Sequence, residues 1–134
     1  MPAVEYVTGL ILSFAVAVFA AVVGLDRDRA FYPTVLIVIA SYYVLFAVMA
    51  ASGPALATEI AVACGFTLIA ILGFQRNLWL VTAALIGHGV FDFVHHWLIE
   101  NHGVPQWWPG FCLAFDVTLG GWLAVRLMSR HTRA

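Results

Sequence analysis

The sequence predicts an all-α integral membrane protein, a bundle of about five transmembrane helices that form a single domain over residues 1–134. The chain is 63% hydrophobic and only 10% charged, and its mean hydropathy is +0.98. Soluble domains carry about 25% charged residues. The apolar residues gather in five stretches, each about as long as the 20 residues that a helix needs to cross a bilayer. These stretches leave no room for a separate soluble domain.

The first stretch lacks a positively charged segment before it, so we interpret it as a retained span and not as a cleaved signal peptide. The connections between stretches are short, which predicts antiparallel neighbouring helices. The predicted spans are Tyr6–Leu25, Pro33–Ala51, Ala55–Phe74, Leu78–Ile99 and Pro109–Met128. The segments between them are polar or rich in turn-forming residues, namely Asp26–Arg29, Ser52–Pro54, Gln75–Asn77 and Glu100–Trp108.

The basic residues predict the orientation of these spans. The chain has no Lys, and its six basic residues are Arg27, Arg29, Arg76, Arg126, Arg130 and Arg133. In a chain with five spans they all fall on one side, in the first loop, the third loop and the C-terminal tail. The positive-inside rule places that side in the cytoplasm, with the C-terminus, and the N-terminus outside. The formal net charge of -1 gives no indication of nucleic-acid binding.

Ionisable side chains interrupt the fourth predicted span. His88, Asp92, His95 and His96 fall within an arc of about 100° on one helix face, at about 100° per residue. An ionised group at the bilayer centre costs about 2.5–3.5 kcal/mol on insertion scales. A metal ion, an ion pair or a neutral protonation state must therefore compensate these groups. This stripe is the best pointer to function in the sequence.

Three further polar side chains lie at a similar depth on other predicted spans, at a rise of 1.5 Å per residue. They are Tyr43, Glu59 and Asp116. We expect the helices that carry Glu59, His88 and Asp116 to be mutual neighbours, with a shared polar cup open to the outside. Below it the same stripe becomes apolar and predicts a sealing floor of Val81, Ala84 and Leu85. Close helix packing is expected at the small residues Gly87, Gly89, Gly120 and Gly121.

The donor types favour a divalent metal ion. Imidazole nitrogens and carboxylate oxygens one helical turn apart suit Zn, Fe or Mn. The candidate ligands are His88, Asp92, His95, His96 and Asp116. Glu59 and Asp116 are candidate catalytic carboxylates, and Tyr43 is a candidate for orienting substrate or water.

Each candidate also has a structural alternative. Asp92 can act as the ion-pair partner of a protonated histidine. Glu59 lies near a predicted helix start, where a carboxylate complements the helix dipole. His96, at the edge of the stripe, can face the lipid headgroups. Cys112 lies one turn before Asp116, and we interpret it as a small core residue.

These patterns support hypotheses of different classes. The first is a metal-dependent membrane hydrolase or oxidoreductase that acts on a lipid-soluble substrate. The alternatives are a metal- or proton-coupled transporter, or a subunit of a homo-oligomer or larger membrane complex whose polar cup holds a cofactor or partner helix. The apolar floor weighs against transport, because a transport path needs polar access from both sides.

Two resemblances accompany these residues. Asp92-x-x-His95-His96 resembles a His-x-x-His-His box of membrane desaturases and hydroxylases, with Asp in place of the first His. The order of Arg29–Pro33, Ser41–Tyr43 and the His88 to His96 stripe resembles an uncharacterised family of small bacterial multi-pass membrane proteins. The second resemblance implies a location in the bacterial inner membrane and no particular activity.

Reporter fusions test the predicted topology. We expect a reporter fused after Ala134 to be active in the cytoplasm and one inserted at Gly103 to be active outside, because the arginines then all face the cytoplasm. Cytoplasmic activity from the Gly103 insertion would overturn the orientation.

Overall fold

The computed structural model describes residues 2–133, with side chains over residues 3–130, and this part of the chain contains only helices and their connections. Arg133, one of the six arginines, therefore has no described side chain. The elements are α1 (Pro2–Val23), the short 3-10 helix η1 (Leu25–Arg27), α2 (Phe31–Met49), α3 (Gly53–Gln75), α4 (Trp79–Leu98) and α5 (Trp108–Arg133). The predicted all-helical class is confirmed.

Four of these helices, α1, α2, α3 and α5, are long and apolar enough to cross a membrane. α4 is not among them, because it carries the polar stripe. The first predicted span is offset: α1 begins at Pro2 and ends at Val23. It stops there because Gly24 adopts a left-handed φ of 92°, a conformation that glycine takes without steric cost and that commonly ends helices.

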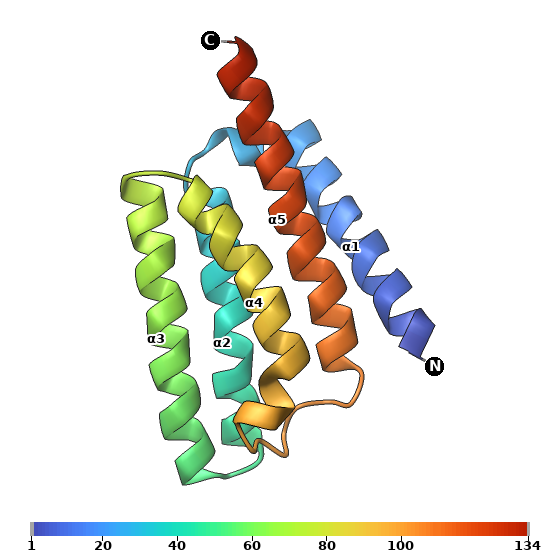
Figure 1. Ribbon diagram of the computed structural model, residues 1–134, viewed down its shortest axis with the longest axis vertical. Coiled ribbons are helices and arrows are strands. Elements are labelled where there is room, and N and C mark those ends of the chain that lie inside the picture. Colours follow the sequence, from blue (N-terminus) through green and yellow to red (C-terminus); the bar gives the residue numbers. More distant parts are fainter. Residues whose placement is uncertain (1, 134) are drawn as a thin grey trace.

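α4 lies in the middle of the bundle (Figure 1). It packs against α5 on one flank and α3 on the other, and α2 packs on α3 and α4. The expected contact of the helices that carry Glu59, His88 and Asp116 therefore holds for α4 with each of the others. α3 and α5, however, flank α4 on opposite sides, so Glu59 and Asp116 approach α4 from different directions.

α4 and α5 meet closely through glycine. A Cβ added at Gly89 would lie 3.1 Å from the Cβ of Asp116, and one added at Gly120 would lie 2.7 Å from Cγ1 of Ile86. The predicted packing role is confirmed for these two glycines. It is wrong for Gly87 and Gly121, where an added Cβ would meet nothing within 4 Å. Gly89 thus lets the backbone of α5 bring Asp116 beside α4.

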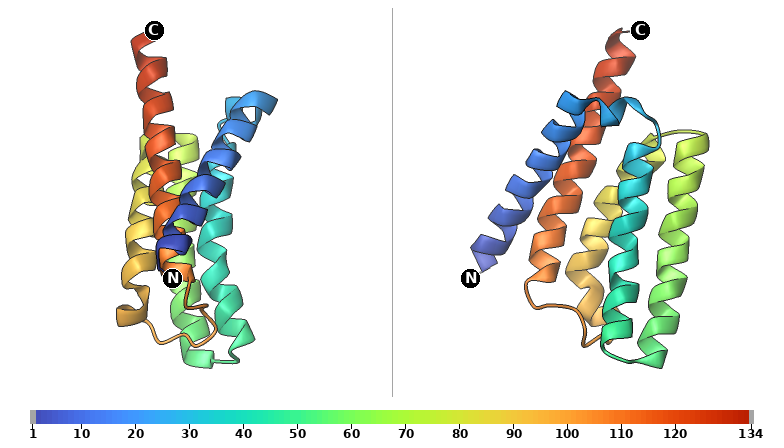
Figure 2. Two further views of the ribbon diagram at one scale, coloured as in Figure 1. Left: turned by 90° about the vertical axis from the view of Figure 1, so that its right-hand side faces the viewer. Right: turned by 180° about the vertical axis from the view of Figure 1, so that it is seen from behind.

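α1 docks on α5 through a stripe of small side chains. Gly9, Ser13 and Ala17 recur every four residues and are buried. The Ser13 hydroxyl donates to the Phe115 carbonyl at 3.0 Å, and a Cβ at Gly9 would lie 2.3 Å from the Phe111 carbonyl oxygen. Small residues allow such close helix approach in membranes. α1 consequently lies against α5 and diverges from α2 toward one end (Figure 2).

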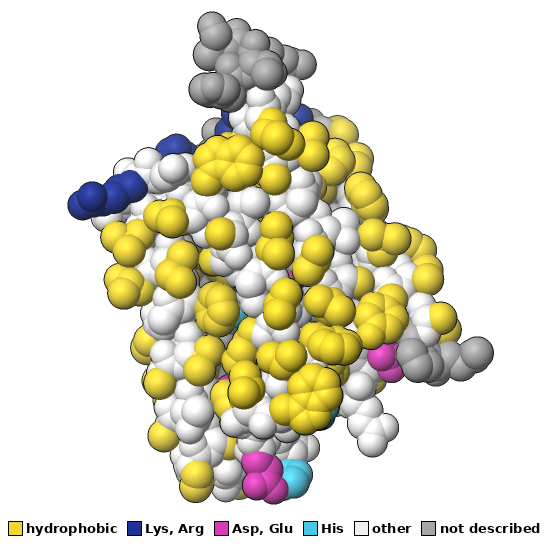
Figure 3. All heavy atoms as spheres, in the orientation of Figure 1, with side chains coloured by type: hydrophobic (Ala, Val, Ile, Leu, Met, Phe, Trp, Pro, Cys, Tyr) yellow, Lys and Arg dark blue, Asp and Glu magenta, His cyan; other side chains and the backbone are white. Residues whose placement is uncertain are grey.

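The described arginines gather at the end of the bundle from which α5 projects (Figure 3). Arg126 pairs with the buried carboxylate of Asp26 at 3.0 Å, and Arg130 donates to the Asp26 carbonyl at 3.2 Å. Arg29 donates through Nε to the Phe74 carbonyl at 2.7 Å, which satisfies a carbonyl at the C-terminal end of α3. Three of the arginines at this end therefore connect neighbouring elements of the bundle.

The predicted floor is part of a buried apolar cluster. Leu85 and Val81 are fully buried and pack with Leu36, Leu119 and Leu123. A smaller aromatic cluster of Tyr43, Phe46, Trp108 and Cys112 lies nearer the opposite end. His88 contacts both clusters, through Phe66 at the edge of the first and Tyr43 in the second.

The close approach at Gly9 predicts that Gly9→Leu destabilises the protein by about 1–3 kcal/mol, because the side chain must displace the backbone of α5. The matched control is Gly65→Leu on α3, where an added Cβ meets nothing within 4 Å. Thermal unfolding in detergent measures both. Equal melting temperatures for the two variants would contradict the docking of α1.

Candidate metal centre

Three of the predicted ligands converge between α4 and α5. His88 and Asp92 lie one turn apart on α4, and Asp116 reaches them from α5. The His88 Nδ1 atom lies 2.9 Å from Asp116 Oδ2 and 3.2 Å from Asp92 Oδ2. One potential ligand atom from each residue lies within 4.8 Å of the others, so the group can hold a metal ion. None of the three side chains is more than marginally exposed.

When both carboxylates are ionised, the charges of this group are not balanced by its own members. Asp92 Oδ2 and Asp116 Oδ1 are buried and lack a hydrogen-bond partner; Asp92 Oδ2 lies within ion-pair distance of His88 without hydrogen-bond geometry. Buried carboxylate oxygens are costly without partners. Even a protonated His88 offsets only one of two ionised carboxylates. One nitrogen and two carboxylate donors with unsatisfied oxygens fit Zn, Fe or Mn.

Tyr43 holds one of these carboxylates in place. Its hydroxyl donates a 2.6 Å hydrogen bond to Asp92 Oδ1, and only 2% of the residue is exposed. Hydrogen bonds from outer residues fix the orientation of metal ligands and tune their affinity. The Tyr43 hydroxyl thus points at Asp92. This differs from the prediction from sequence, in which Tyr43 orients substrate or water.

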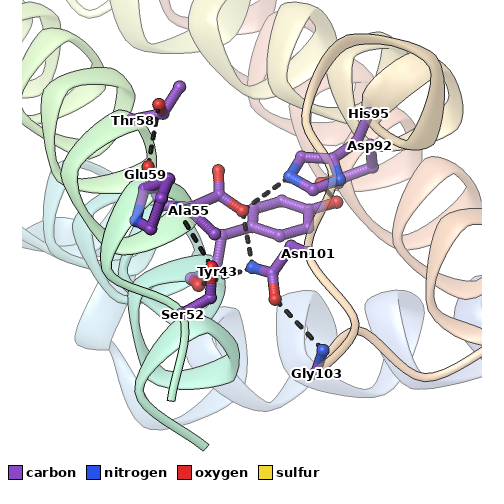
Figure 4. A network of polar contacts seen from close by, with 10 residues as sticks. Tyr43, Ser52, Ala55, Thr58, Glu59, Asp92, His95, Asn101 and Gly103 are labelled. Carbon is purple, nitrogen blue, oxygen red and sulfur yellow. Dashed lines mark hydrogen bonds and ion pairs between the residues drawn. The ribbon is translucent and has the colours of Figure 1, made fainter. Parts of the chain in front are cut away.

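His95 and Glu59 form a second group (Figure 4). His95 Nε2 lies 2.7 Å from Glu59 Oε2. The Asn101 amide donates to the same oxygen at 2.8 Å and to the Tyr43 carbonyl at 3.2 Å, and its own oxygen accepts from the Gly103 N–H at 3.1 Å. Asn101 was not among the predicted site residues, because it lies in a connection and outside every predicted span. The Asn101-x-Gly103 turn signal was the only available hint.

Tyr43 joins the two groups. Its hydroxyl bonds Asp92 of the first group, and its ring stacks on the His95 imidazole of the second, with centroids 4.0 Å apart and planes 9° apart. His95 and Glu59 can neutralise each other as an ion pair. The second group therefore pairs one carboxylate with one imidazole, whereas the first has two carboxylates for one imidazole. Glu59 Oε1, like Asp92 Oδ2 and Asp116 Oδ1, is buried without a hydrogen-bond partner.

The two other histidines with described side chains, His96 and His102, lie outside both groups. His96 is exposed on α4, as its position at the edge of the predicted arc allows. His102 pairs with Glu100 at 3.2 Å, and both side chains are more than four-fifths exposed. Of the five predicted ligands, the structure brings together His88, Asp92 and Asp116, pairs His95 with Glu59, and leaves His96 facing outward.

The two groups border different cavities instead of one shared cup. A pocket of about 430 Å³ beside the α4–α5 connection has His95, His96 and Asn101 in its lining. A largely apolar groove of about 890 Å³ runs between α1, α2 and α5, and Asp116 forms part of its wall. The His88 group thus borders, through Asp116, a groove that lies between helices.

The Tyr43 hydrogen bond predicts that Tyr43→Phe lowers stability by about 1–3 kcal/mol, because the change leaves a buried Asp92 oxygen unpaired. Tyr42→Phe is the matched control, since Tyr42 is 38% exposed. Chemical unfolding of both variants in detergent gives the two free energies. A loss no larger than that of the control would show that the bond contributes little.

Comparison with known proteins yields no match. No family model, curated protein or solved structure is significantly similar to the chain.

Proposed function

We propose that this chain is a metal-dependent membrane enzyme, a hydrolase or an oxidoreductase, whose centre is the His88, Asp92 and Asp116 group. The observation that carries the proposal is the convergence of one imidazole and two carboxylates, all buried, with two carboxylate oxygens unpartnered. A divalent cation would balance two ionised carboxylates, which no described neighbour does. The ions that suit this donor set are Zn, Fe and Mn.

The distances are compatible with ligation. In tetrahedral coordination with metal–ligand bonds of 2.0–2.2 Å, neighbouring ligand atoms lie about 3.4 Å apart. The His88 Nδ1 atom lies 2.9 Å and 3.2 Å from its two carboxylate neighbours. Three protein ligands leave a further coordination position open, which is the arrangement of catalytic zinc sites. A divalent ion bound here supplies a Lewis acid that polarises a substrate oxygen or activates water.

Neighbouring residues hold the three candidate ligands in position. Tyr43 fixes the rotamer of Asp92 by its 2.6 Å hydrogen bond. Gly89 allows α5 to approach α4, which sets the distance between Asp116 and His88. Glu59 bonds His95 and Asn101 and does not reach the ligand group, so we no longer favour it as the catalytic base.

We place the chain in the bacterial inner membrane, with the arginine-bearing end of the bundle in the cytoplasm. In this setting α4 also crosses the bilayer, which gives five spans together with α1, α2, α3 and α5. Its buried positions hold His88, Asp92 and His95, whereas its exposed positions hold His96 and the apolar residues Val90, Phe93, Trp97 and Leu98. Packing against α2, α3 and α5 therefore hides three of the four residues of the polar stripe from lipid, which makes a span of modest hydropathy acceptable.

An enzyme accounts for the structure better than a transporter does. Val81, Ala84 and Leu85 follow His88 toward the arginine-bearing end and belong to the buried apolar cluster, together with Leu119 and Leu123. This layer offers no continuous polar path among the described residues. The buried group is thus placed for chemistry at one depth and not for passage through the bundle.

We expect purified protein to contain about one Zn, Fe or Mn ion per chain, as measured by elemental analysis after detergent extraction. His88→Ala and Asp116→Asn should each lower the metal content about tenfold or more, because each removes one of three ligands. The matched controls are His96→Ala and His102→Ala, which remove exposed histidines and should leave the metal content unchanged.

Two results would contradict the proposal. One is metal-free protein that is fully stable and cannot be loaded with any of the three ions. The other is metal content that survives His88→Ala and is lost in a His95→Ala variant, which would move the site to the second group.

A further inference from the structure

The groove between α1, α2 and α5 is open toward the surface that would face lipid. Its wall includes Leu12 on α1, Val38 on α2 and Phe115 on α5. α1 packs on α5 and leaves α2 free along this side, which keeps the groove open between helices. From Phe31 to Tyr42 it follows α2 for about 16 Å, at 1.5 Å per residue. Its shape and lining suit an elongated apolar chain.

One stripe of α5 contributes polar side chains to the otherwise largely apolar groove. Trp108, Cys112 and Asp116 recur every four residues and all line the groove. Trp108 is 8% exposed, and its Nε1 donor is buried without a hydrogen-bond partner. Asp116 carries the unpartnered Oδ1 atom and belongs to the ligand group. This stripe of α5 thus separates the apolar groove from the candidate metal centre, and Asp116 belongs to both.

The charges of the lining discriminate between lipid classes. The groove contains Asp28 and Asp116 but no Lys, Arg or His among its described residues. A phosphate or carboxylate headgroup seated along the Trp108–Asp116 stripe would meet the Asp116 carboxylate with no cation in the lining to offset it. Arg27 lies beside Gly24, near the Asp28 end of the groove. A hydroxyl, carbonyl or ester oxygen can accept the free Trp108 N–H, which otherwise stays unsatisfied at a cost.

We propose that the groove binds an uncharged long-chain lipid laterally from the bilayer. Its alkyl or isoprenoid tail lies between α1 and α2, and its single oxygen function lies along the Trp108–Asp116 stripe. This inference rests on the proposed function, since it names the substrate class of that centre. Lateral entry explains how a centre without solvent exposure receives a substrate.

Photo-crosslinking in proteoliposomes tests the proposal. The probe is a long-chain alkyl alcohol with a mid-chain diazirine, and the comparison probe is the alkyl phosphate of the same chain length. We expect the alcohol to label the groove faces of α1, α2 and α5, and the phosphate to label them about tenfold less. Peptide mapping by mass spectrometry locates the labels.

Val38→Trp supplies the blocking variant, and Val18→Trp the matched control. Both valines are 47% exposed on candidate membrane spans, but only Val38 lines the groove. Val38→Trp should lower groove labelling by the alcohol about tenfold, whereas Val18→Trp should leave it unchanged. Leu12→Trp, on the opposite wall, should repeat the Val38 result, which guards against misfolding of a single variant.

Other outcomes overturn the proposal. Labelling spread evenly over all exposed helix faces would mean ordinary surrounding lipid, and equal labelling by the phosphate would exclude the uncharged class. Crosslinks between protein chains in place of lipid labels would show that a second copy covers the groove. Metal content, measured on the same samples, separates the two claims: groove labelling in protein that binds no metal contradicts the centre alone, and metal-loaded protein without groove labelling contradicts the lipid alone.

Discussion

The structure depends on the cost of keeping ionisable side chains inside an apolar bundle. His88, Asp92 and His95 all project from α4, and each of them is buried. Uncompensated charges at such positions would oppose insertion. The bundle solves this by placing α4 in the middle, where α5 supplies Asp116, α3 supplies Glu59 and α2 supplies Tyr43 (Figures 1 and 4). The packing of α2, α3 and α5 around α4 therefore provides partners for the polar side chains of that one helix.

The solution divides the polar residues into two unequal groups. Glu59 lies 2.7 Å from His95 and accepts a further hydrogen bond from Asn101, which suits a structural pair. His88 faces two carboxylates and can offset only one of them. Buried groups with incomplete partners are costly, and natural proteins retain them where function requires it. This imbalance, together with the adjacent apolar groove, is why we place the chemistry at the first group.

The helical class and the polar stripe were readable from hydropathy and the 3.6-residue period. The period identifies which side chains share a face of α4, but it does not identify the helix that covers each part of that face. For that reason Glu59 and Asp116 were expected in one cup and instead lie on opposite flanks. The packing glycines show the same limit: the helical period places Gly87 and Gly89 on different faces of α4, but only the structure shows that α5 covers the face of Gly89. Asn101 was missed because no periodicity governs a connecting loop.

The most direct test of the account is an anomalous difference map from crystals of the metal-loaded protein, recorded at the absorption edge of the bound metal. The account predicts one peak between α4 and α5, within about 2.0–2.3 Å of His88 Nδ1 and of one oxygen from each of Asp92 and Asp116. A peak at the His95–Glu59 pair or at the exposed histidines would contradict it. So would a map without a peak in which His88 and Asp116 keep their direct 2.9 Å contact.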